Sequence, residues 1–263
     1  MKKYVYIALF TSLTFSAVCS HADETPEEKG MAIARETDRR DSGFGDSAYE
    51  SIFTLRNEQG EESIREFSIK TLEVKDDGDK ELGLFHKPAD VQGTAVLTFS
   101  HGLQPDDQWL YLPVLKRVKR ISSVNKSGPF VGSEFAFEDI ASWEINKYTY
   151  RYLRDEVLDG QDCFVVENTP AYEYSGYSKQ IEWVDKAMYQ PRKIDYYDRK
   201  GDLLKTLSFS DYHQYLNQYW RASKLEMVNH QTGKSTVMAR NQYQFRNGFK
   251  DSDFAENALK NVQ

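Results

Sequence analysis

The sequence predicts a mainly β protein in which one large antiparallel sheet curls. After residue 46 the chain is a succession of strand-like segments separated by short turns, several of which contain glycine. Connections this short join antiparallel neighbours, because parallel strands need long crossovers. No helical pattern interrupts the series, and the 17 Tyr and 15 Phe residues suit half-exposed strands. Many short hairpins without interleaved helices favour a single curling sheet.

The first 22 residues are typical of a secretory signal peptide. Lys2 and Lys3 form its positive end, residues 4–18 are predominantly apolar, and Ser20-His21-Ala22 resembles a small-x-small cleavage site. We therefore predict export and a mature chain that starts at Asp23. No later apolar segment approaches the length of a membrane span, so we expect this mature chain to be soluble.

Two other interpretations of this segment stay open. A lipoprotein signal would use Cys19, but Val18 stands where a small residue is needed. A retained membrane anchor would need about 20 apolar residues, and this stretch is shorter.

The mature chain, residues 23–263, has a length that suits one β-rich domain, which we expect to be a monomer. The whole sequence has a net charge of −7, and removing the two signal lysines makes it more negative. This balance argues against a nucleic-acid partner, which needs concentrated positive charge. Cleavage also removes Cys19 and leaves Cys163 without an internal disulfide partner. We expect Cys163 to be a small buried side chain.

The mature chain begins with an expected amphipathic helix. Thr25-Pro26-Glu27-Glu28 is a helix start, and the pattern continues to about Arg40 before a polar linker over residues 41–46. At the other end, Asp251-Ser252-Asp253 caps a predicted short helix with an apolar face. We expect that helix to pack across the open edge of the sheet. The first strands expected between these ends are Tyr49–Arg56, Ser63–Val74, Leu82–Lys87 and Thr94–Ser100.

The segment from Asp106 to Ile140 is the most informative part of the chain. On a strand, Trp109 and Tyr111 share one face and Leu110 and Leu112 share the other, so both faces are covered or one lines a cavity. The following residues, 114–121, suit a short amphipathic helix and a second strand equally well.

This segment resembles the outer-membrane lipoprotein-sorting protein family, periplasmic proteins similar to the bacterial lipoprotein carrier. The shared pattern is W-x-Y-x-P, then R-V-x-R-I, then F-x-G-S-x-F-x-x-x-D. The matching residues are Trp109, Tyr111, Pro113, Arg117, Val118, Arg120, Ile121, Phe130, Gly132, Ser133, Phe135 and Asp139. Pro129 departs from the pattern and leaves the conformation of its loop open.

The resemblance implies a half-open antiparallel β-barrel with N- and C-terminal helices and a lid near its mouth, residues 128–142. It also implies a turn over Pro113–Lys116 and a strand over Arg117–Ser122. The implied function is periplasmic binding and transfer of a lipid or lipidated protein toward the outer membrane. A resistance-nodulation-division (RND) type exporter is the implied partner. The rival interpretation is an accessory or sensor subunit that binds a membrane protein and carries nothing.

Two groups of residues are candidate binding sites. Six aromatic residues are expected to line or cover an apolar ligand site. A structural core role is the competing interpretation, because buried aromatics on a strand need no ligand to explain them. They are Trp109, Tyr111, Phe130, Phe135, Phe137 and Trp143. A basic cluster, Lys116, Arg117, Lys119 and Arg120, is either a solvated strand edge or a docking surface for an acidic partner or anionic lipid headgroups.

No catalytic or metal-binding motif is present in the sequence. The histidines after the signal are far apart and none has metal-ligand spacing, so we expect no metal and no cofactor. Glu138 and Asp139 would lie on opposite faces of a strand, which is poor geometry for paired acid–base work. The chain is therefore not expected to be an enzyme.

Overall fold

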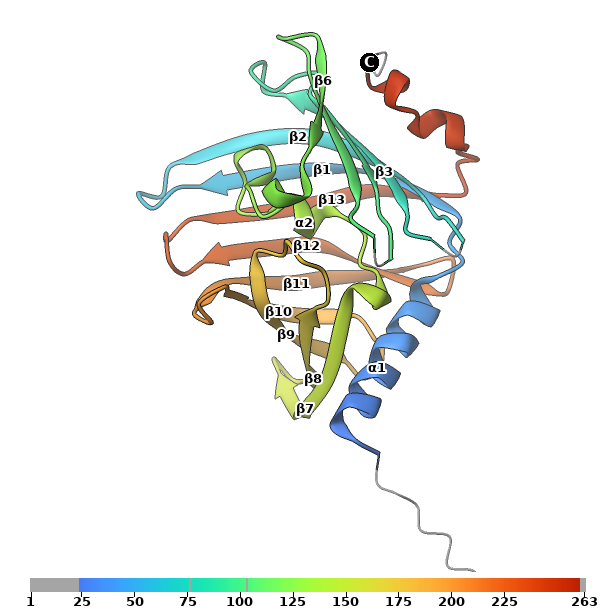
Figure 1. Ribbon diagram of the computed structural model, residues 1–263, viewed down its shortest axis with the longest axis vertical. Helices are drawn as coiled ribbons and strands as arrows, with labels where there is room; N and C mark the ends of the chain where they lie inside the picture. The colour runs from blue at the N-terminus through green and yellow to red at the C-terminus, as the bar shows by residue number, and fades with distance from the viewer. Residues whose placement is uncertain (1–23, 76, 103, 261–263) are drawn as a thin grey trace, which may run out of the picture.

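The computed structural model describes residues 24–75, 77–102 and 104–260. The predicted signal peptide and its cleavage site lie outside these ranges. A single antiparallel sheet of 13 strands dominates the fold, in the order β6-β5-β4-β3-β2-β1-β13-β12-β11-β10-β9-β8-β7 (Figure 1). Each strand pairs with its neighbours, but β6 and β7 do not pair with each other. The predicted mainly β, unclosed antiparallel sheet is thus confirmed.

The strands before residue 122 agree with the predicted ones to within a few residues at each end, and seven more follow. They are β1 (Asp46–Arg56), β2 (Glu62–Leu72), β3 (Lys80–Lys87), β4 (Ala95–Phe99), β5 (Asp107–Leu112), β6 (Arg117–Ile121), β7 (Tyr148–Leu158), β8 (Gln161–Pro170), β9 (Tyr177–Asp185), β10 (Pro191–Asp198), β11 (Leu203–Tyr215), β12 (Tyr219–Asn229) and β13 (Ser235–Phe245). The ambiguous segment after Pro113 is a turn followed by β6, as the family resemblance implied.

The order of the strands makes the loop between β6 and β7 the connection between the two edges of the sheet. The first strand, β1, pairs with the last, β13, in the middle of the sheet, for example Phe53 opposite Met238. The two free edges are therefore consecutive in the chain. The connection between them, residues 122–147, must pass from one edge of the sheet to the other, and we call it the crossing segment. It contains η1 (Ser123–Asn125), η2 (Phe130–Gly132), α2 (Phe137–Ile140) and η3 (Ile145–Lys147).

The N-terminal helix α1 (Pro26–Asp41) packs beside β7, as Figure 1 shows. Its first turn is fixed by the predicted start signal: Thr25 Oγ1 accepts from the Glu28 N–H, and the Glu28 carboxylate accepts from the Thr25 N–H. A side chain at Gly30 would meet the backbone nitrogens of Arg151 and Tyr152 at 2.8 Å. Only glycine permits this close approach of helix and strand.

The C-terminal segment differs from the prediction. It forms two 3-10 segments, η4 (Asp251–Phe254) and η5 (Glu256–Lys260), instead of one helix. Phe254 and Leu259 are buried against Leu82, Leu84 and Leu97 on the outer face of the sheet. This face of β3 and β4 carries apolar side chains that the segment shields from water. The segment therefore packs on this face and not across the open edge of the sheet.

Candidate ligand cavity

A cavity of about 1150 Å³ lies between the inner face of the sheet, α1 and the crossing segment. Its volume exceeds that of an ordinary small-molecule pocket, which is roughly 300–1,000 Å³. Buried residues of β11, β12 and β13 form an apolar part of its wall, including Leu207, Leu225 and Met238. The cavity therefore offers an apolar surface inside a curved sheet, with the crossing segment beside it.

Buried polar contacts hold the crossing segment in place. The Glu138 carboxylate accepts hydrogen bonds from the Tyr172 hydroxyl at 2.9 Å, the Ser175 hydroxyl at 3.0 Å and the Gly176 N–H at 2.9 Å. Asp139 pairs with Lys205 of β11 at 2.6 Å. The two carboxylates lie on a helical turn, α2, so the predicted strand arrangement is wrong. Their roles are structural because each is fully engaged with the surrounding protein.

A second buried charge cluster fixes the two ends of the crossing segment. Asp106, which precedes β5, accepts from Lys126 at 3.0 Å and from Lys147 at 2.7 Å. All three side chains are buried. The two ammonium groups compensate the negative charge of the buried carboxylate. Burial by itself would raise the pKa of Asp106, but the two lysines keep it below its usual value.

Three phenylalanines of the crossing segment enter the aromatic core. Phe130, Phe135 and Phe137 are all buried, and Phe135 stacks on Phe53 of β1 with ring centroids 5.5 Å apart. Phe130 contacts the Phe85 ring at 5.9 Å. Of these three, only Phe135 also contributes to the cavity wall. The segment is thus anchored by aromatic packing as well as by charge.

The other predicted ligand residues lie in two places. Trp143 is 37% exposed, lines the cavity and stacks on Tyr148. Trp109 and Tyr111 pack on the outer face with the cluster that the C-terminal segment covers, and they do not belong to the cavity wall. The cavity thus contains Phe135 and Trp143 of the six aromatic candidates.

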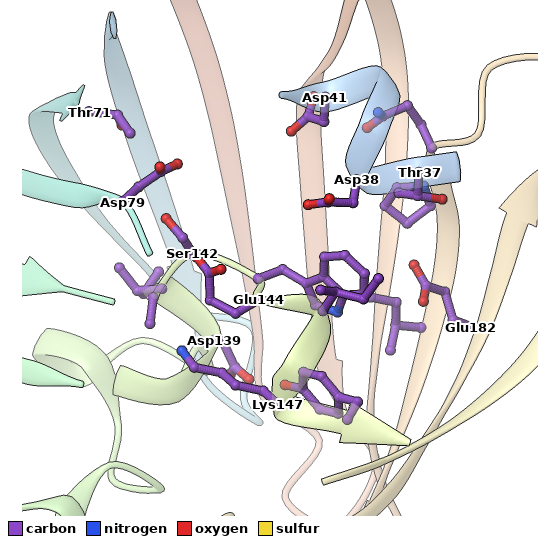
Figure 2. Close-up of a pocket in the computed structure, with 18 of the residues that line it drawn as sticks. Thr37, Asp38, Asp41, Thr71, Asp79, Asp139, Ser142, Glu144, Lys147 and Glu182 are labelled. Atoms are coloured by element: carbon purple, nitrogen blue, oxygen red, sulfur yellow. The ribbon is translucent and has the colours of Figure 1, made fainter. Parts of the chain in front are cut away.

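The cavity wall also carries carboxyl groups that the sequence did not mark. Burial, together with the charge of the neighbouring Asp79, raises the pKa of Glu81 to about 8. Burial likewise raises the pKa values of Asp79 and Glu144 to about 7. The pKa values of Asp38 and Glu182 are raised as well, again mainly by burial. Figure 2 shows several of these side chains around the cavity, on strands, on α1 and on the crossing segment.

The sequence held only a weak signal for these groups. Glu182 alternates with Ile181 and Trp183 on β9, so it lies on the opposite face of the strand from these two apolar residues. Such a pattern usually means that the polar face is solvated. Here the polar position faces the cavity, and only the curvature of the sheet reveals this.

The predicted basic cluster lies on the β5–β6 hairpin, which extends at the top of Figure 1. Lys116, Arg117, Lys119 and Arg120 are all exposed, and Arg120 also pairs with Asp107. The turn of this hairpin presents two bare apolar side chains, with Val114 86% and Leu115 60% exposed. The hairpin therefore combines an apolar tip with positively charged flanks.

Cys163 is fully buried with Val165, Ile181 and Trp183, which confirms the expected packing role. Among the residues that the structure describes, no group of three or more His, Cys, Asp or Glu side chains could hold a metal ion. None of the described helices has the length and apolar character needed to cross a membrane.

Comparison with known proteins assigns the chain to a family. Its structure resembles an outer membrane lipoprotein-sorting protein domain from Vibrio parahaemolyticus with a TM-score of 0.88. The two sequences are 55% identical, and the match covers 89% of this chain and 99% of that one. The chain belongs to the outer membrane lipoprotein-sorting protein family. This confirms the resemblance on which the fold prediction depended.

Other comparisons agree with the family assignment. A DUF1329 family protein from Desulfovibrio piger is 30% identical over 89% of this chain and 99% of its own, with a TM-score of 0.85. A LolA superfamily protein from Nitrosomonas europaea shares the fold, with a TM-score of 0.70 and 21% identity over 87% of this chain and 98% of its own. The predicted LolA-like fold is therefore confirmed.

Two further comparisons add less. A family model described as "Uncharacterized protein" matches residues 77–261. A search among curated proteins found no match. Lipoprotein sorting is a carrier's task and not a catalysed reaction, so membership of the family agrees with the expectation that the chain is not an enzyme.

Proposed function

We propose that the protein is a periplasmic carrier that binds a lipid, or the acyl chains of a lipidated protein, in the cavity and helps to transfer it toward the outer membrane. The observation that carries this proposal is the large cavity with an apolar wall in a member of a lipoprotein-sorting family. Burying an acyl chain is favourable by about 0.8 kcal/mol per CH₂ group, so a chain in this cavity binds without any catalytic group.

The crossing segment supports this proposal because it forms part of the cavity wall. Phe135 and Trp143 are its aromatic contributions to the wall. Exchange of a ligand requires an opening, and Trp143, which is partly exposed, lies where the segment returns to β7. We assign Phe135 to the floor of the site and Trp143 to its entrance.

The carrier function is tested by native mass spectrometry of protein purified from the periplasm. A co-purifying lipid mass, and uptake of the neutral fluorescent probe phenylnaphthylamine by delipidated protein, are the expected results. A clean protein mass together with no uptake of the probe would exclude the carrier. An RND-type exporter recovered with such ligand-free protein would instead support an accessory subunit.

We further propose that the β5–β6 hairpin is the docking element. Its basic side chains are complementary to a surface of anionic lipid headgroups, and its exposed Val114 and Leu115 reach the apolar boundary below them. An RND-type exporter in the inner membrane is the proposed partner at that surface. A pull-down with and without the hairpin charges tests whether the exporter, or the lipid alone, retains the protein.

Export requires the signal segment, and we propose cleavage after Ala22. The intact mass of the periplasmic protein tests this proposal. A mass that starts at Asp23 supports it, whereas an acylated Cys19 would place the protein on a membrane by a lipid anchor.

A further inference from the structure

The cavity wall has an acidic region beside its apolar floor. Seven of its carboxyl groups have no cationic side chain within 4.0 Å among the residues that the structure describes. Two of the seven are held by other donors: Glu73 accepts from the N–H groups of Gly43 and Gly45, and Glu138 accepts from Tyr172, Ser175 and Gly176. Five carboxyl groups remain. They are Asp38, Asp79, Glu81, Glu144 and Glu182. Other carboxylates of the wall have cationic partners: Asp106 and Asp139 have lysine partners, and Asp41 pairs with Arg221.

Two of these five groups act electrostatically on a third. Asp38 comes from α1, Asp79 from the turn before β3, and Glu144 from the crossing segment. Burial raises the pKa of Glu144, the charge of Lys147 lowers it, and the charges of Asp79 and Asp38 both raise it. Figure 2 shows the three side chains around one space. Like charges that are held together in this way are stabilised by a cation placed between them.

Unpaired hydrogen-bond acceptors in the cavity wall give independent evidence for a ligand that donates hydrogen bonds. Four buried side-chain polar atoms have no partner among the described residues, and three of these belong to residues of the cavity wall. These are Thr37 Oγ1, Glu81 Oε2 and Asn168 Oδ1, and each can accept a hydrogen bond. Asn168 is only 1% exposed, and its amide group donates to Glu182 at 2.6 Å. A ligand that supplies N–H donors would satisfy such atoms.

We propose that the cavity selects an amphiphile whose polar group is a protonated amine. The ammonium group lies among Asp38, Asp79 and Glu144, and the apolar chain follows Leu207, Leu225 and Met238. This inference rests on the proposed carrier function and specifies the chemical class of its ligand.

An organic cation fits these groups better than a metal ion. A metal ion needs its ligands within coordination distance of one point. No three His, Cys, Asp or Glu side chains of the described residues meet that requirement. An amine with an apolar tail uses both the separated carboxylates and the apolar floor.

The test compares three ligands of equal chain length: an alkylamine, an alkyl alcohol and an alkyl carboxylate. Each displaces phenylnaphthylamine from delipidated protein at neutral pH, below the concentration at which it forms micelles. We expect the amine to bind at least about ten-fold more tightly than the carboxylate, with the alcohol between them. Calorimetry in two buffers of different ionisation enthalpy should show proton release on binding of the amine and none for the alcohol.

Variants separate the carboxyl groups from the rest of the cavity. The double variant Asp79→Asn, Glu144→Gln should lose about ten-fold in affinity for the amine and keep its affinity for the alcohol. The alcohol therefore reports that the variant is folded. Glu58→Gln, in the exposed turn between β1 and β2, is the matched control and should change neither affinity.

The outcomes distinguish this inference from the carrier function. If all three ligands displace the probe equally well, the carrier function stands and the selection of amines is refuted. If the amine is preferred but the double variant keeps that preference, the assignment to Asp79 and Glu144 is refuted. If neither the probe nor any of the ligands binds, the carrier function itself is refuted.

Discussion

The ammonium group of Lys205 lies 2.6 Å from a carboxylate oxygen of Asp139, and both side chains are almost completely buried. Lys205 belongs to β11 in the sheet, whereas Asp139 belongs to α2 in the crossing segment. Lys205 also donates to the carbonyl of Glu134, and Asp139 accepts from the Tyr177 hydroxyl at 2.7 Å. This pair therefore fastens the crossing segment to the strands that form the floor of the cavity.

Breaking the pair should be costly. Lys205→Met leaves the Asp139 carboxylate buried without its cation, and we expect a loss of about 3–5 kcal/mol in the free energy of unfolding. The double variant Lys205→Met, Asp139→Leu should recover much of this loss, because no uncompensated charge remains. Urea unfolding of the two variants measures the difference. Arg56→Met, which removes an exposed partner of Glu62, is the control and should cost less than about 1 kcal/mol.

Phe135 and Phe137 should separate packing from ligand binding. Both are buried, so we expect Phe135→Ala and Phe137→Ala each to cost about 3–5 kcal/mol of stability, measured by thermal unfolding. Only Phe135 lies in the cavity wall, so only Phe135→Ala should change the affinity for phenylnaphthylamine. Equal effects of the two variants on the probe would contradict the assignment of Phe135 to the floor of the site.

Reversing charges on the β5–β6 hairpin should weaken docking. The double variant Lys116→Glu, Arg117→Glu is expected to lower association with vesicles of anionic phospholipid, most strongly at low salt. Both side chains are exposed, so thermal stability should change by less than about 0.5 kcal/mol. Lys200→Glu and Lys234→Glu, in exposed turns elsewhere, provide the control. If vesicle binding at low salt is unaltered, the cluster is an ordinary solvated strand edge.

The hairpins and the N-terminal helix could be predicted because their signals are local. The glycine-containing turns, the Thr25–Glu28 capping box and the alternation in β5 are each set by neighbouring residues. Periodicity does not decide between helix and strand for the segment after Pro113, because a short apolar pattern suits both equally. The family pattern decided it, and β6 is the strand that it implied.

The cavity could not be predicted residue by residue because it depends on long-range curvature. Alternation places Trp109 and Tyr111 on the same face of β5, but it does not say which face is the inner one. The C-terminal segment covers the face that carries these two residues. In the same way, Glu182 and Asp38 are ordinary polar positions in the sequence, and they meet the cavity only when α1 packs beside the end of the sheet.

The acidic region of the cavity should make stability depend on pH. Unfolded carboxyl groups titrate near pH 4, whereas burial in the folded protein raises the pKa of Glu81 to about 8 and that of Asp79 to about 7. Between these limits the folded state binds more protons than the unfolded state. The free energy of unfolding therefore falls as pH rises through this window, and the loss is complete above the folded pKa values.

Glu81→Gln should reduce this pH dependence, because the amide cannot ionise. We expect the variant to gain stability relative to the wild type as pH rises from about 5 to about 8, measured by urea unfolding across that range. Glu58→Gln, at an exposed position, should follow the wild-type curve. If Glu81→Gln also runs parallel to the wild type, Glu81 is ionised throughout this range and the cavity wall already stabilises its charge.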